Sequence, residues 1–201
     1  MEVKTDLHNY IIEFDNVMPK DIHKNFKKIC ENSNAFQDAA IIGNVKNKSH
    51  TEIEQIVNPL IRKTSTWSPE NITAKSLTEA HWANFLLNTF KCFIEMYQEQ
   101  ITFYEKFQIK ELSILKYSLG GHYRFHTDHH RKVPRLYSCI FLVNDDYEGG
   151  DLIFKYPNSE KITKINKKQN KMIIWPSNFL YPHSITPVTK GERYSVVAWA
   201  L

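Results

Sequence analysis

The C-terminal half of the chain is divided into short hydrophobic segments separated by turn residues, and this pattern limits the fold more than any other feature. Candidate strands, with period-two alternation or short apolar runs, lie at residues 111–118, 123–128, 135–143, 151–156, 161–165, 171–175, 183–188 and 193–201. The segment 135–143 is almost continuously apolar, so we expect it to be covered on both faces. Many short strands at this spacing indicate a two-sheet barrel or jelly roll.

The N-terminal half contains segments with a helical period. After a candidate strand at residues 10–17, apolar residues recur with helical spacing over residues 19–30, which predicts a helix. A longer helix is predicted over residues 77–100, with Ser76 as its N-cap and Glu79 completing a capping box. Its many large apolar side chains suggest that it packs against the sheet.

The pattern between these two helices is weaker. Residues 31–50 are polar and contain Gly43 and Asn44, so we expect a loop there. Residues 52–63 could form a short helix or an irregular arm, and their apolar spacing favours the helix although Pro59 interrupts it.

These elements predict an α+β fold in one domain that covers residues 1–201. Residues 1–110 are expected to form a helical N-terminal support, and residues 111–201 the catalytic jelly-roll core. The N-terminal helices would buttress a double-stranded β-helix of the cupin-like type. A chain of 201 residues is long enough to bury a core of this kind.

Composition adds a few limits on location and partners. The net charge of +4 indicates a solvated basic surface rather than an anionic partner. The three cysteines, Cys30, Cys92 and Cys139, are odd in number and far apart, so we expect no disulfide framework. We find no signal-peptide pattern and no membrane-spanning apolar run, and therefore expect a cytoplasmic protein. The Lys, Asn and Ile bias is typical of an AT-rich bacterial or phage genome.

Two side chains near the middle of the C-terminal half begin a candidate metal site. Residues two apart in an extended strand point to the same face, so the His126 imidazole and the Asp128 carboxylate can converge. His183 offers a second imidazole later in the chain. Two histidines and one carboxylate on one face of a metal, with the other positions open, are typical of non-haem Fe(II) oxygenases. These three residues are the candidate iron ligands and catalytic residues.

Other histidines remain alternative ligands from sequence alone. His122 and His130 share the strand parity of His126 if the strand stays regular, whereas His129 has the opposite parity. The strand has ended by Arg131, so we place His129 and His130 on the rim of the site.

Arg193 adds a cation to the same face on one condition. It lies ten positions after His183, and we interpret the intervening segment as a hairpin whose three-residue loop ends at Gly191. That register places Arg193 and Ser195 on the face of His183, whereas a two-residue turn would place them on the other face. With the three-residue turn, the guanidinium can hold a carboxylate in bidentate fashion.

Three stretches resemble one enzyme family. They are the run from Tyr117 through Gly120-Gly121 to His126-Thr127-Asp128, the segment 145–152 and the segment 175–193. All three are similar to 2-oxoglutarate and Fe(II)-dependent dioxygenases, most closely to the prolyl 4-hydroxylase-like branch with its bacterial and phage members. The similarity covers about residues 111–201.

The resemblance implies a set of cofactors and their ligands. Fe(II) would be bound by His126, Asp128 and His183, and 2-oxoglutarate by Arg193, with Tyr117 and Ser195 as further cofactor-binding residues. Dioxygen is the second co-substrate, and ascorbate is a candidate reductant. Some relatives place another tyrosine in the strand after the metal strand, but residues 139–142 contain no phenol.

The resemblance also implies the reaction, which is hydroxylation of a peptidyl proline with release of succinate and CO2. The partner would be a peptide or protein that contains proline. The candidate residues for substrate contact or a lid are Tyr123, His129, Arg131, Trp175 and Trp199. The loop after Arg131 and the segment 40–70 are candidate lids that exclude water.

Two alternative functions stay open. One is a nucleic-acid or small-molecule oxygenase of the same superfamily, and the other is a non-catalytic metal-binding barrel. Nucleic-acid demethylases of this kind usually carry a second arginine six residues after the first. Here that position is Trp199, which makes nucleic acid the less favoured partner.

Overall fold

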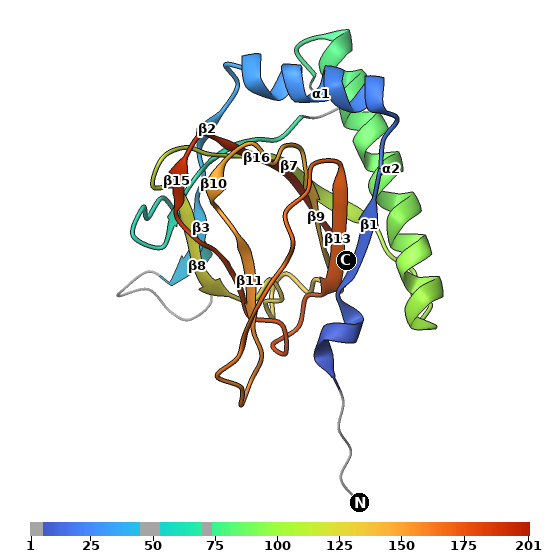
Figure 1. The fold of residues 1–201 in the computed structure, drawn as a ribbon. Helices are drawn as coiled ribbons and strands as arrows, with labels where there is room; N and C mark the ends of the chain where they lie inside the picture. The colour runs from blue at the N-terminus through green and yellow to red at the C-terminus, as the bar shows by residue number, and fades with distance from the viewer. Residues whose placement is uncertain (1–5, 45–52, 70–73) are drawn as a thin grey trace, which may run out of the picture.

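The computed structural model describes residues 6–44, 53–69 and 74–201, and within them two antiparallel sheets enclose a common interior (Figure 1). The larger sheet contains, in spatial order, β1 (Ile12–Asp15), β13 (Lys171–Pro176), β9 (Tyr137–Leu142), β16 (Arg193–Ala200), β7 (Ile109–Tyr117), β6 (Ser65–Trp67) and β2 (Gln37–Asp38). The smaller sheet contains β12 (Ile162–Lys164), β11 (Leu152–Lys155), β14 (His183–Ile185), β8 (His122–His126) and β5 (Arg62–Lys63). The expected double-stranded β-helix is confirmed.

Two short strand pairs flank these sheets. They are β10 (Glu148–Gly149) with β15 (Val188–Lys190), and β3 (Ile41–Asn44) with β4 (Ile53–Ile56). A short 3-10 helix, η1 (Leu7–Tyr10), precedes β1.

Both predicted α-helices are present and cover one face of the larger sheet (Figure 1). They are α1 (Lys20–Asn32) and α2 (Leu77–Ile101), and the Ser76 side chain caps α2 by accepting a hydrogen bond from Glu79 N–H. Their apolar stripes meet sheet residues in one cluster that includes Phe26, Cys30, Trp82, Leu86, Phe90, Ile114, Phe141 and Val196. Burying each large apolar side chain contributes about 1.5–3 kcal/mol. Among the described residues, neither helix is long and apolar enough to cross a membrane.

The larger sheet separates this helical layer from the interior of the barrel. Along β16, the side chains of Tyr194, Val196 and Ala198 pack toward the helices, whereas Val197 and Trp199 belong to the second core, between the two sheets. All six residues of β9 are buried, as expected for a strand covered on both faces. The functional side chains discussed below lie in this interior, because strand alternation directs them there.

Two predictions for residues 31–63 are wrong. Residues 37–38 and 41–44, which lie in the expected loop, form β2 and β3, while β4 and β5 replace the expected short helix. The helical spacing is overridden by strand pairing with β3 and β8, a tertiary effect that local periodicity does not contain. The N-terminal half therefore also supplies strands to both sheets, and the division at residue 110 stays a prediction.

The expected hairpin between His183 and Arg193 is also wrong. β14 pairs with β8 and β11, whereas β16 pairs with β7 and β9, so this segment crosses from one sheet to the other. β15 lies between them and pairs with β10. Gly191 does adopt the left-handed conformation, with φ of 74°. Arg193 reaches the interior because it begins β16 in phase with Ser195 and Val197.

Candidate metal centre

An irregularity in β8 sets the direction of His126. Tyr123 pairs with Ile185, and His126 pairs with His183, so an extra residue is accommodated on β8 between the two pairs. Such a bulge re-aims side chains. Tyr123 and His126 both face the interior, while the intervening Arg124 and Phe125 are exposed.

Contrary to the prediction from side-chain alternation, His126 and Asp128 do not lie on one regular strand. Asp128 lies beyond the last strand residue, in the following loop, and not on the same regular strand as His126. His122 does not share the position of His126, and its Nδ1 contacts the Gly120 carbonyl at 3.0 Å. The His130 side chain accepts a hydrogen bond from the Lys132 backbone N–H. Neither alternative histidine belongs to the metal-ligand cluster found among the described residues.

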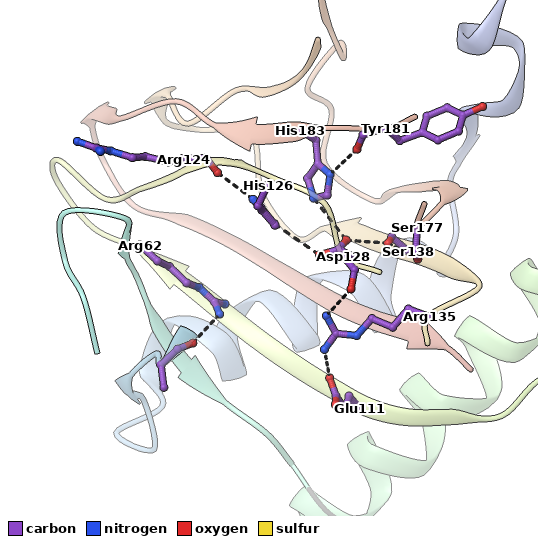
Figure 2. Close-up of polar contacts among 11 residues, drawn as sticks. Arg62, Glu111, Arg124, His126, Asp128, Arg135, Ser138, Ser177, Tyr181 and His183 are labelled. Carbon is purple, nitrogen blue, oxygen red and sulfur yellow. Dashed lines mark hydrogen bonds and ion pairs between the residues drawn. The ribbon is translucent and has the colours of Figure 1, made fainter. Parts of the chain in front are cut away.

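The structure brings His126, Asp128 and His183 together. One donor atom from each lies within 4.8 Å of the others. His126 Nε2 is 3.5 Å from Asp128 Oδ1, and His183 Nε2 is 3.4 Å from Asp128 Oδ2 (Figure 2). The three side chains therefore converge on one point inside the barrel.

Backbone contacts determine which imidazole nitrogen faces that point. His126 Nδ1 lies 2.8 Å from the Arg124 carbonyl, and His183 Nδ1 lies 3.1 Å from the Tyr181 carbonyl. A carbonyl only accepts, so both Nδ1 atoms carry the proton. The Nε2 lone pairs then face the acceptor oxygens of Asp128. Acceptors facing one another need a cation between them, and two imidazoles with one carboxylate suit Fe(II).

Burial shapes the charges of this cluster. Burial lowers the pKa of His183 to about 4, so its imidazole is neutral at neutral pH. Burial alone would raise the pKa of Asp128, but His183, His126 and a hydrogen bond from Ser138 hold it well below its usual range. The cluster therefore offers a neutral His183 imidazole and an anionic Asp128 carboxylate to a metal ion.

A pair of serines holds the Asp128 carboxylate and was missed by the sequence argument. Ser138 Oγ donates to Asp128 Oδ2 at 2.7 Å, and Ser177 Oγ lies 2.7 Å from Ser138 Oγ (Figure 2). Because a carboxylate only accepts, the Ser138 proton goes to Asp128, and Ser177 must donate to Ser138. Both serines are buried. No sequence signal marks them, because each becomes adjacent to Asp128 only in the folded barrel.

The predicted co-substrate residues also lie together. Arg193 is fully buried, and its Nη1 donates to Ser195 Oγ at 2.7 Å. Its guanidinium carbon is 5.0 Å from the Tyr117 ring centroid. Nε and Nη2 of Arg193 have no hydrogen-bond partner among the described residues. A buried cation with unused donors fits an anionic ligand, and the planar fork suits a carboxylate.

Tyr147 is a further neighbour of Arg193 that the sequence argument missed. A Cβ built on Gly150 would lie 3.0 Å from both Tyr147 Cε2 and Arg193 Cδ, so the tyrosine ring and the arginine stem flank this glycine. Burial raises the pKa of Tyr147, while the charge of Arg193 opposes the rise. Residues 139–142 of β9 contain no phenol, and Tyr147 places one near Arg193 from a loop.

Two of the candidate substrate or lid residues touch the metal-ligand histidines. The Tyr123 ring stacks on His126 at 3.6 Å between centroids, and the Trp175 ring meets His183 edge-on at 4.9 Å. Trp175 Nε1 is a buried donor without a partner among the described residues. These aromatic rings therefore pack against two of the candidate ligands.

The other candidates lie at the rim. Trp199 is covered by Arg135, whose guanidinium carbon is 3.9 Å from its ring centroid. His129 and Arg131 are exposed in the loop after β8, and the structure does not bring them to the three candidate ligands. Residues 45–52 and 70 of the candidate lid segment 40–70 lie outside the described residues.

Comparisons with known proteins agree with this geometry. Residues 112–201 match the family model described as the 2OG-Fe(II) oxygenase superfamily. Prolyl 3-hydroxylase 2 of Homo sapiens is 39% identical over 66 residues, which cover 32% of this chain and 9% of that protein. The chain thus matches only about a tenth of the length of that curated relative.

Solved structures share the fold. A prolyl hydroxylase from Trichoplax adhaerens, in complex with a hypoxia inducible factor oxygen degradation domain peptide fragment, superposes with a TM-score of 0.71 at 17% identity. The match covers 96% of this chain and 84% of that one. A prolyl-4-hydroxylase from Pseudomonas putida gives a TM-score of 0.65 at 17% identity, covering 94% and 91%. Residues 112–201, a little under half of the chain, are thus similar to the 2OG-Fe(II) oxygenase superfamily, and the solved structures show a shared fold.

Proposed function

We propose that this protein is an Fe(II)- and 2-oxoglutarate-dependent hydroxylase that acts on a peptidyl proline and releases succinate and CO2. One observation carries the proposal. The fully buried Arg193, with two unpartnered donor nitrogens, lies in the same barrel interior as the cluster of His126, Asp128 and His183. A buried cation without a neutralising partner destabilises the fold. A metal-binding barrel without an anionic co-substrate would gain nothing that offsets this cost.

The residues divide into two binding groups. His126, Asp128 and His183 would hold Fe(II), with the two Nδ1–H groups fixing the imidazoles and Ser138 fixing the carboxylate. Arg193 would hold the distal carboxylate of 2-oxoglutarate, with Tyr117, Ser195 and Tyr147 around it. When bound, Fe(II) supplies the activation of dioxygen that couples decarboxylation of 2-oxoglutarate to hydroxylation of the substrate.

The apolar lining of the interior supports this chemistry by excluding water. Leu115, Ile140 and Val197 of the larger sheet belong to one buried apolar cluster with Phe154 and Ile185 of the smaller sheet. Trp175 and Tyr123 close the space around the two histidines. A dry site strengthens the attraction between Arg193 and a carboxylate and protects reactive species from side reactions.

The choice of a peptide substrate rests on similarity. Prolyl 3-hydroxylase 2 shares 39% identity over 66 residues, and the Trichoplax adhaerens enzyme of the same fold was solved with a peptide fragment. We extend the prolyl substrate to this chain as part of the proposal. Ascorbate is its candidate reductant.

The test uses the full chain reconstituted anaerobically with Fe(II) and then exposed to air with 2-oxoglutarate and proline-containing peptides. We expect succinate release together with a mass gain of one oxygen atom on a proline, and fragment analysis against 3- and 4-hydroxyproline standards gives the ring position. Succinate coupled to oxidation of an oligonucleotide or a free small molecule, but of no peptide, would replace the prolyl substrate. Iron binding without any succinate would support the non-catalytic barrel.

A further inference from the structure

Most of the net positive charge of the chain, three of the four units, comes from residues 122–135, which include two of the candidate metal ligands. The whole chain has 26 Lys and Arg residues against 22 Asp and Glu residues. Residues 122–135 contain four of the former and one of the latter, which leaves 22 basic and 21 acidic residues elsewhere. The chain is therefore nearly balanced except in the stretch that includes His126 and Asp128.

The fold adds a cation from another strand to this stretch. We define the cationic rim as Arg62, Arg131 and Arg135. Arg62 on β5 lies 4.9 Å above the Tyr123 ring, which in turn stacks on His126. Figure 2 shows Arg62 and Arg135 near the candidate metal ligands, whereas the Arg124 guanidinium points away from them.

A backbone contact ties the rim to a candidate ligand, because Arg135 Nη1 donates to the Asp128 carbonyl at 3.3 Å. Arg131 lies between these two residues in the loop after β8, flanked by His130 and Val133, which form an isolated bridge. Arg62 and Arg135 therefore lie beside the candidate ligands, and Arg131 is exposed in the adjoining loop.

Little of this charge is neutralised by the residues that the structure describes. Arg135 pairs with Glu111, whereas Arg62 and Arg131 have no described carboxylate within 4.0 Å. The Arg62 side chain donates to the Ala40 carbonyl, a neutral acceptor. The charge of Asp128 is directed to the metal position, so it does not offset the rim.

We propose that the peptide taken by this site is acidic, with Asp or Glu side chains close to the target proline. The inference rests on the proposed function and names its substrate class. Guanidinium groups bind carboxylates through paired hydrogen bonds, and a cleft of one charge raises the association rate of an opposite partner. At physiological salt, screening limits this attraction to about 8–10 Å. An extended peptide covers about 3.3–3.6 Å per residue, so we place the relevant carboxylates within about three residues of the proline.

A nucleic acid is the less suitable polyanion for this rim. Specific nucleic-acid interfaces are large and neutralise several phosphates along the backbone. Here the excess charge is confined to residues 122–135 and Arg62, while the rest of the chain is nearly balanced. A short acidic peptide matches that extent better.

The experiment compares two peptides of equal length that differ only in having Asp and Glu, or Asn and Gln, beside the proline. Binding to the full chain with Fe(II) and 2-oxoglutarate is measured anaerobically by fluorescence anisotropy, and kcat/KM is measured in air. We expect the acidic peptide to be favoured about tenfold at low salt, with the preference shrinking as salt is added.

Matched variants locate the effect. Arg131→Glu and Arg62→Glu should each reduce the preference for the acidic peptide while leaving the KM for 2-oxoglutarate unchanged. Lys24→Glu makes the same charge change at an exposed position of α1, on the other side of the larger sheet, and should keep the preference. Two rim variants are used so that a folding defect in one does not decide the result.

Several results would overturn the inference. Equal binding of the acidic and amide peptides, a rim variant that changes only the KM for 2-oxoglutarate, or tighter binding of a short oligonucleotide than of the acidic peptide would each do so. Failure of the proposed function gives a different outcome. The acidic peptide would then still bind preferentially, through the rim, but no peptide would gain oxygen.

Discussion

Ser138 Oγ donates a 2.7 Å hydrogen bond to Oδ2 of Asp128, and Ser177 lies behind it at the same distance from Ser138. The two serines come from β9 and from the segment after β13, so the folded barrel holds the carboxylate in a fixed orientation. This relationship fixes the one anionic side chain of the candidate centre and leads to the first prediction.

Ser138→Ala should weaken Fe(II) binding by about tenfold or more, because groups that orient a metal ligand typically contribute that much to affinity. Ser138→Thr retains a hydroxyl and should recover part of the loss. The measurement is anaerobic Fe(II) titration, with circular dichroism to check folding. Equal Fe(II) affinity in Ser138→Ala and the wild type would show that Asp128 is held without this hydrogen bond.

Arg193→Ala should weaken 2-oxoglutarate binding by about two orders of magnitude, because a buried charge-assisted contact is lost. Fe(II) binding should persist, since the candidate iron ligands are other residues. Arg193→Lys should restore part of the affinity with a point charge in place of the fork. Co-substrate titration by the visible absorption of the iron–2-oxoglutarate complex measures both variants. Unchanged 2-oxoglutarate affinity in Arg193→Ala would assign the carboxylate to another cation.

Gly150→Ala should selectively weaken 2-oxoglutarate, because the added Cβ would lie 3.0 Å from Arg193 Cδ and from Tyr147 Cε2. Gly120→Ala is the matched control. It has a similar positive φ, 73° against 61°, but its Cβ would meet only the flexible end of Lys63 at 3.3 Å. Both should lose some stability from backbone strain. Thermal unfolding and 2-oxoglutarate titration separate the two effects, and equal loss of 2-oxoglutarate affinity in both would contradict the assignment.

The metal-free protein should lose stability as the pH falls from about 6.5 to about 4. Burial lowers the pKa of His183 to about 4 in the folded state, so the unfolded chain binds a proton first. Stability is then lost below the unfolded pKa and levels off below the folded one, as far as this group is concerned. Urea unfolding at several pH values, compared with His183→Gln, measures the contribution. The same slope in both proteins would mean that His183 does not cause it.

Much of the C-terminal fold could be predicted from the sequence because its signals are local. Period-two segments and the continuous apolar run of β9 define strands whatever their partners are. The strands β2, β3, β4 and β5 could not be predicted, since short polar segments become strands only through pairing such as Arg62 with Tyr123.

The candidate site was also predictable only where its signals are local in the sequence. His126, Asp128, His183 and Arg193 were found by motif, yet two of the geometric reasons were wrong. A bulge in β8 aims His126, and a crossover between the sheets delivers Arg193. Ser138, Ser177 and Tyr147 were missed because they approach the site from distant segments and carry no spacing signal.

The most direct test of the central claim is the anaerobic visible absorption of the full chain with Fe(II) and 2-oxoglutarate. We expect the wild type to show a charge-transfer band that saturates at one iron per chain. His122→Ala should keep the band, while the single alanine variants of His126, Asp128 and His183 should lack it and remain folded by circular dichroism. No band in the wild type, or a full band in any of the three ligand variants, would contradict the account.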